Sequence, residues 1–105
     1  NLEAYDYNNN NSVIVDNLAF NYYLLGELDK AEEIYEKLMT QNPTYPEAYY
    51  NYGLTLEAKN KSDKALEFME KALSFKFTFL STVSREEVEN KIKELRAKKQ
   101  NSDEQ

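Results

Sequence analysis

The chain has 105 residues, of which 41% are hydrophobic and 13% aromatic, enough for the core of one small domain. It contains neither cysteine nor histidine, which excludes disulfides, thiolate or imidazole metal sites and the common Ser-His and Cys-His nucleophile pairs. Nineteen acidic and thirteen basic residues give a net charge of −6, so nucleic acid is a poor partner.

Other features of the composition also argue against catalysis and membrane insertion. Only two glycines are present, so no glycine-rich loop can cradle a phosphate. Acidic pairs such as Glu32 and Glu36 are interpreted as a solvated helix face rather than as an acid and base pair or as calcium ligands. No apolar run is long enough to span a membrane. We therefore expect no enzymatic activity, no cofactor and no metal.

The predicted elements are four helices paired into two hairpins, followed by a fifth helix. The first four are expected at residues 13–25, 29–41, 46–59 and 63–75. Ser12 is the expected N-cap of the first helix, and Gly26 ends it because glycine adopts a left-handed backbone at low cost. Pro43 follows the second helix, and Pro46 opens the third, where a missing N–H is tolerated.

The first eleven residues include four consecutive asparagines and allow two interpretations. Residues 1–11 are either a disordered leader or the end of a preceding second helix, with the asparagines replacing a turn. The second interpretation is favoured because a shift of thirty-four residues aligns Ala4 with Leu38 and Tyr5 with Met39. The first complete repeat would then have an uncovered face, which either residues 1–7 fold back to cover or a second copy of the chain binds.

The C-terminal part has a well-defined helix start. Ser84 and Glu87 form a capping-box pattern, and Val83 and Val88 flank it as a hydrophobic staple. The single apolar stripe of this helix comprises Val88, Ile92 and Leu95. Residues 85–99 carry six bases and four acids, which suits an acidic body with 13 acids and 7 bases in residues 1–84. We predict a capping helix preceded by an irregular connector, with the phenylalanines of residues 75–79 packed under the helix.

An internal repeat defines the fold. Residues 29–37 and 63–71 share six of nine identities at a separation of thirty-four, which indicates stacked supersecondary units. The surrounding positions of both copies repeat a pattern of large, apolar, small and aromatic residues, and the first copy ends in proline. In the first copy they are Val15, Leu18, Ala19, Tyr22, Ala31, Tyr35 and Pro43. In the second copy they are Tyr49, Tyr52, Gly53, Leu56, Ala65 and Met69. The second copy departs from the pattern with Phe77 in the proline position and Asn60 opposite Gly26, which affects loop geometry only.

The chain therefore resembles the tetratricopeptide repeat family. The resemblance implies an all-α fold, an α-solenoid of two antiparallel helix-turn-helix repeats with a C-terminal capping helix. The expected boundaries are 12–45 and 46–79 for the repeats, 80–99 for the connector and capping helix, and 100–105 for a disordered tail. Small residues such as Ala31 and Ala65 permit close helix approach, and most of the tyrosines are packing material.

The resemblance also implies a partner-binding site. On the first helix of each repeat, the positions that packing does not use would line a concave groove for a peptide or a helix. The candidate residues are Asp16, Phe20, Tyr23, Leu24, Glu47, Tyr50, Leu54 and Glu57. Their apolar side chains would anchor the ligand, and their acids would select basic side chains. The alternative is that Phe20 and Tyr23 pack against the N-terminal element.

We therefore expect a non-catalytic protein–protein interaction scaffold for a basic or apolar peptide or helix. The alternative is a structural segment of a longer solenoid, or a dimerising module with no free peptide site. The C-terminal carboxylate of a chaperone is not an expected ligand. Domains that bind it use a lysine and an asparagine on the first inner helix, an asparagine on the second and two bases on the third. Of these residues, only the asparagine of the second inner helix is present, as Asn51. On the first inner helix the equivalent position holds Asp16, which would repel a carboxylate. No signal in the sequence indicates a compartment, and the cytoplasm is favoured by default.

Overall fold

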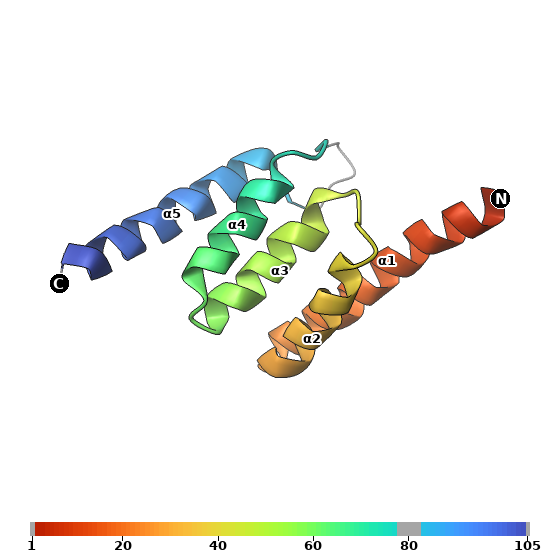
Figure 1. Cartoon of the computed structure of the whole chain (residues 1–105), viewed down its shortest axis with the longest axis horizontal. Helices are drawn as coiled ribbons and strands as arrows, with labels where there is room; N and C mark the ends of the chain where they lie inside the picture. Colours follow the sequence, from red (N-terminus) through yellow and green to blue (C-terminus); the bar gives the residue numbers. More distant parts are fainter. Residues whose placement is uncertain (1, 78–82, 105) are drawn as a thin grey trace. The chain divides into compact units, whose positions relative to one another are not determined.

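Five α-helices make up the regular structure of the described part of the chain (Figure 1). The computed structural model describes residues 2–77 and 83–104, with side chains at 12–77 and 83–98. The helices are α1 (Leu2–Leu24), α2 (Leu28–Met39), α3 (Pro46–Ala58), α4 (Ser62–Ala72) and α5 (Arg85–Glu104). They form two compact units, Asn1–Thr44 and Tyr45–Gln105. The predicted all-α class, with two helical hairpins followed by a fifth helix, is confirmed.

The first unit is the hairpin of α1 and α2. α2 is amphipathic, because its buried residues Ala31, Tyr35 and Leu38 recur at spacings of four and three. Ala19 of α1 is also fully buried. The side chains of Ala19 and Ala31 are small, so the backbones of α1 and α2 can approach each other closely.

The second unit contains α3, α4 and α5, with α3 packed on α4 and α4 on α5. Its fully buried side chains include Tyr52, Leu56, Met69, Val88 and Leu95. The approach of α3 to α4 requires glycine at position 53. A Cβ on Gly53 would lie 2.6 Å from Cγ of Met69 and 3.2 Å from the carbonyl oxygen of Ala65.

Aromatic rings fill much of the remaining core of the second unit. The ring of Tyr49 stacks on Phe75 with centroids 4.8 Å apart, and the rings of Tyr52 and Phe68 lie 4.6 Å apart. Burial raises the pKa of the Tyr49 hydroxyl. The connector phenylalanines were expected under α5, but Phe75 stacks on α3 instead. The guanidinium carbon of Arg85 lies 5.3 Å from the centre of the Phe77 ring. Position 79 lies outside the described residues.

The two hairpin turns have the same backbone geometry despite different residues. Gly26 has φ +84°, as predicted for a left-handed helix end, and Asn60 at the equivalent position has φ +65°. In both turns the next N–H donates to the carbonyl five residues earlier over 2.9 Å. Asparagine tolerates this conformation better than other residues with a Cβ. The substitution in the second repeat therefore leaves the turn unchanged.

The predicted start of α1 is wrong. The helix begins at Leu2 and runs without interruption to Leu24, so the asparagines lie within it and Ser12 is not its N-cap. Ser12 is buried within the hairpin instead. Each asparagine lowers helix stability by only about 0.7 kcal/mol relative to alanine, and no proline or glycine interrupts residues 2–24. A turn at residues 8–11 and a folded-back leader are therefore both excluded.

The predicted boundaries of α5 are correct at its start and wrong at its end. The N–H of Glu87 donates to Oγ of Ser84 over 3.1 Å, and Val83 and Val88 are buried, as the capping pattern predicts. The helix continues to Glu104, although residues 100–105 were expected to be disordered. No glycine or proline interrupts this stretch. Among the described residues, none of the helices has the length and apolar character needed to cross a membrane.

Candidate protein-interaction surfaces

The candidate residues of the first unit include an aromatic pair on α1. The rings of Phe20 and Tyr23 are stacked, with centroids 5.4 Å apart and planes 20° apart, and both side chains are half-buried. Leu24 follows directly and is 65% exposed. The structure therefore brings three of the predicted anchors together on neighbouring turns, with apolar surface open to solvent.

Asp16 has a different position from the one expected. Its side chain is only 4% exposed. The hydroxyl of Tyr35 donates to Oδ1 of Asp16 over 2.8 Å, which joins α1 to α2. Asp16 lies four residues after Ser12 and three before Ala19, and all three are buried, so the α2 face of the helix includes position 16. The carboxylate thus serves the packing of the hairpin, which the sequence pattern did not indicate.

The candidate residues of the second unit are more enclosed. Tyr50 is buried, whereas Glu47 and Leu54 are half-buried. All three lie on α3 at spacings of three and four, so they share one side of that helix. Only part of this predicted stripe can therefore contact a ligand without movement of side chains.

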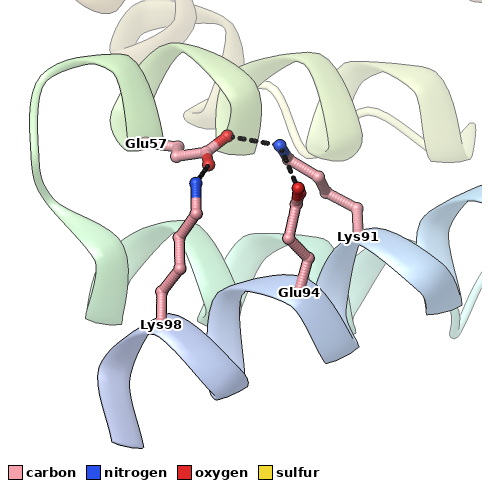
Figure 2. A network of polar contacts seen from close by, with 4 residues as sticks. All are labelled: Glu57, Lys91, Glu94 and Lys98. Carbon is pink, nitrogen blue, oxygen red and sulfur yellow. Dashed lines mark ion pairs between the residues drawn. The ribbon is translucent and has the colours of Figure 1, made fainter. Parts of the chain in front are cut away.

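Glu57 contacts the capping helix rather than solvent (Figure 2). Its carboxylate accepts ion pairs from Lys91 at 2.9 Å and from Lys98 at 3.5 Å, both on α5. Lys91 also contacts Glu94 at 2.8 Å, so the ammonium lies between two carboxylates. These four residues, Glu57, Lys91, Glu94 and Lys98, are called the α3–α5 ion network below. Their role could not be read from the sequence, because the pairing depends on how α5 is placed.

Protonation in the network follows from its geometry. Partial burial alone would lower the pKa of Lys91, but its hydrogen bonds to Glu94 and Glu57 prevail and raise that pKa well above 10.5. The same hydrogen bond from Lys91 lowers the pKa of the Glu94 carboxyl. The ammonium and the Glu94 carboxylate are therefore both charged over the whole neutral range.

Two arginines attach α5 to α4. Arg85 donates to the carbonyl oxygen of Leu73 over 3.0 Å, which satisfies a carbonyl at the C-terminal end of α4. Arg96 pairs with Glu70. An open cleft of about 280 Å³ between the two helices is lined by Glu70, Leu73, Glu89, Ile92, Lys93 and Arg96. Arg85 and Arg96 of the capping helix thus contact the repeat itself. Within the described residues, no group of three or more acidic side chains is placed to hold a metal ion.

A second exposed apolar surface on α1 was not among the predicted site residues. Ile14 is 64% exposed, Leu18 is 49% exposed and Leu25 is 75% exposed. With Asn21 they recur at spacings of four, three and four, and we call these four residues the α1 outer face. The spacing is visible in the sequence, but the repeat pattern assigns Leu18 to packing.

The helical hairpins, the buried small residues at their contacts and the matching left-handed turns define a helical-repeat protein. Comparison with known families specifies which one: residues 9–76 match the family model described as tetratricopeptide repeat. The chain therefore belongs to the tetratricopeptide repeat family.

Two curated relatives are similar to part of the chain. They are the aspartyl/asparaginyl beta-hydroxylases of Mus musculus and Homo sapiens, which are 27% identical to it over 62 and 64 residues. These matches cover 59% and 61% of this chain but only 8% of each hydroxylase. The similarity therefore concerns a small segment of each enzyme. Tetratricopeptide repeats generally mediate protein–protein interaction, and the family assignment supports protein partners for this chain.

Proposed function

We propose that the chain is a non-catalytic interaction scaffold that binds a peptide or a partner helix in the concave groove typical of its family. The repeats would comprise residues 12–45 and 46–79, with α1 and α3 as the inner helices. The observation that carries the proposal is the stacked pair of Phe20 and Tyr23 beside exposed Leu24. Rigid, partly exposed aromatic side chains are typical anchors for a protein ligand, and Leu24 adds exposed apolar surface beside them.

The proposed site is smaller than the predicted stripe. Asp16 and Glu57 are engaged inside their own units, so we assign them to packing rather than to ligand selection. In the second unit, half-buried Leu54 and Glu47 are the proposed contacts. Tyr50 lies between them in the sequence of α3 and is buried, so we assign it to packing beneath the site. Residues 1–44 contain eight acids and two bases, so a ligand with basic side chains is favoured.

The proposal is tested by selecting peptides from a displayed random library against the whole chain and measuring their affinity by fluorescence anisotropy. We expect Phe20→Ala and Leu54→Ala each to weaken binding at least about tenfold, because truncated anchors lose buried contact area. Leu25→Ala is the matched control, since Leu25 is exposed but belongs to the α1 outer face. It should change affinity less than about twofold.

Circular dichroism separates a binding role from a folding role. All three variants should retain the helicity and the thermal midpoint of the original chain. A selected peptide whose affinity is insensitive to both Phe20→Ala and Leu54→Ala would overturn the proposed site. Failure of the library to yield any peptide would overturn the proposed function.

A further inference from the structure

The α1 outer face is unlike the exposed side of an ordinary surface helix. Ile14, Leu18, Asn21 and Leu25 contain no charge, and they lie opposite the side of α1 that buries Ala19 against α2. Helices α2 and α4 instead carry exposed acids and bases on their outer sides. An apolar stripe on the exposed side of a packed helix is typical of an interaction surface.

The second repeat shows what this face requires. A shift of thirty-four residues aligns Ile14 with Ala48, Leu18 with Tyr52 and Asn21 with Thr55. The three residues of α3 are fully or almost fully buried. The same positions of a repeat are therefore covered in one unit and exposed in the other, where two of them are the apolar residues Ile14 and Leu18. The α1 outer face thus has the composition of an interface.

The spacing of the α1 outer face fits a helix as the occupant. Intervals of four, three and four residues form the seam along which one α-helix packs on another. Asn21 lies within this seam, where a polar residue fixes the register of the pairing helix at a cost in stability.

The chain contains a helix of the kind that covers an open repeat. α5 buries one apolar stripe of Val88, Ile92 and Leu95, and its bases Lys91 and Arg96 pair with acids of α3 and α4. The second repeat is therefore covered by a helix with an apolar seam and basic flanks.

Charge favours the same chemistry for the first unit. Its eight acids and two bases give residues 1–44 a net charge of −6, whereas residues 45–105 carry eleven of each and are neutral. No basic residue lies in the last turn of α1, where the carbonyls carry partial negative charge, and Glu27 follows directly. A second copy would bring two such acidic units together, which costs free energy.

We propose that the α1 outer face binds an amphipathic helix with basic flanks from a partner protein. The partner places its apolar seam on Ile14, Leu18 and Leu25, a polar residue opposite Asn21, and lysine or arginine beside the seam. This surface lies on a different side of α1 from Phe20 and Tyr23, so it is independent of the peptide site proposed above.

The probe is a synthetic helical peptide of three heptads, with leucines in its seam, one seam asparagine, and lysine and arginine elsewhere. An acidic twin has glutamate in place of every base. Binding of both to the full chain is measured by fluorescence anisotropy, and sedimentation gives the mass of the chain alone. The test variant is Ile14→Ser with Leu25→Ser. Val13→Ser is the matched control because Val13 is 45% exposed and lies next to Ile14 on α1 but outside the α1 outer face.

We expect the basic peptide to bind, the acidic twin to bind at least about tenfold more weakly, and the double variant to lose at least about tenfold in affinity. Val13→Ser should retain affinity within about threefold, and circular dichroism should be unchanged for all variants. No binding, equal binding of both peptides, or equal losses in the double variant and the control would each overturn the proposal. A dimer that the double variant dissociates would also overturn it, in favour of a second copy as the occupant.

Discussion

At the scale of single residues, the two hairpin turns use one backbone geometry with two different amino acids. Gly26 and Asn60 both have positive φ, and a Cβ built on Gly26 meets no atom within 4 Å. The requirement at position 26 is therefore conformational and not steric. Glycine and asparagine satisfy it, whereas alanine does so only with strain.

We predict that Gly26→Ala lowers the free energy of unfolding by about 1 kcal/mol, because the left-handed conformation is unfavourable for alanine. Gly26→Asn should stay within about 0.5 kcal/mol of the original chain, since Asn60 adopts that conformation in the second turn. Urea unfolding followed by circular dichroism measures both. Equal losses for alanine and asparagine would contradict this explanation.

A buried polar pair is the other informative feature at this scale. Tyr35 donates to the carboxylate of Asp16 inside the first hairpin, whereas the second repeat has Met69 and Tyr50 at the equivalent positions. A hydrogen bond to a buried charged group contributes more than one between neutral groups. The pair therefore gives the first repeat a specific polar contact between its helices.

We predict that Tyr35→Phe destabilises the chain by about 1.5–3 kcal/mol, because the buried carboxylate loses a donor. Asp16→Asn retains an acceptor and should have a smaller effect. The double variant tests coupling, and its loss should be less than the sum of the single losses. Additive effects, or a Tyr35→Phe variant as stable as the original, would show that the hydrogen bond contributes little.

Sequence reasoning succeeded where local pattern determined the result. The period of thirty-four residues predicted the hairpins, Gly26 predicted a left-handed turn, and Ser84 predicted the start of α5. It failed at Ser12, because serine is a good N-cap but also fits a buried position inside a longer helix. Helical spacing also placed Asp16 among the candidate groove residues, although its side chain is buried. Spacing alone does not show which side of α1 faces α2.

At the scale of whole helices, the attachment of α5 depends on charge as well as on its apolar stripe. The α3–α5 ion network places Lys91 between Glu57 and Glu94, and the side chains of Lys91 and Glu57 are mostly shielded from solvent. Partly buried pairs of this kind are screened less by salt than exposed pairs. The sequence predicted a basic capping helix, but its partners required the structure.

We predict that Lys91→Gln destabilises the second unit by about 1–2 kcal/mol, because two carboxylates lose a shared cation. Lys93→Gln, on the same helix and exposed, is the control and should change stability by less than about 0.5 kcal/mol. Urea midpoints followed by circular dichroism measure the difference. Equal effects of the two substitutions would assign no special role to the network.

The network should also give stability a defined dependence on pH. The pKa of Lys91 is raised in the folded chain, so its contribution is present below 10.5 and is lost as pH rises through the folded value. The pKa of Glu94 is lowered, so its contribution is present above 4.5 and is lost as pH falls through the folded value. The gap in stability between the original chain and Lys91→Gln should therefore be largest near neutral pH and smaller in strong acid. A gap that does not change with pH would contradict these assignments.

At the scale of the whole molecule, the two units differ in charge and in how their surfaces are used. The second unit is neutral overall, and its acids Glu57 and Glu70 are paired with the bases of α5. The first unit carries the whole net charge of the chain, and residues 1–44 contain only two bases, Lys30 and Lys37. Partner binding is therefore proposed mainly on α1, with a peptide site on one side and a helix site on the other.

The most direct test of the central proposal is to map a library-selected peptide on the isotopically labelled chain by nuclear magnetic resonance. We predict that the largest shifts and intermolecular contacts fall on Phe20, Tyr23, Leu24 and Leu54, with little change at Glu33 or Glu67 on the outer sides of α2 and α4. Contacts confined to α2 and α4, or a peptide that binds without perturbing the Phe20–Tyr23 pair, would contradict the proposed site.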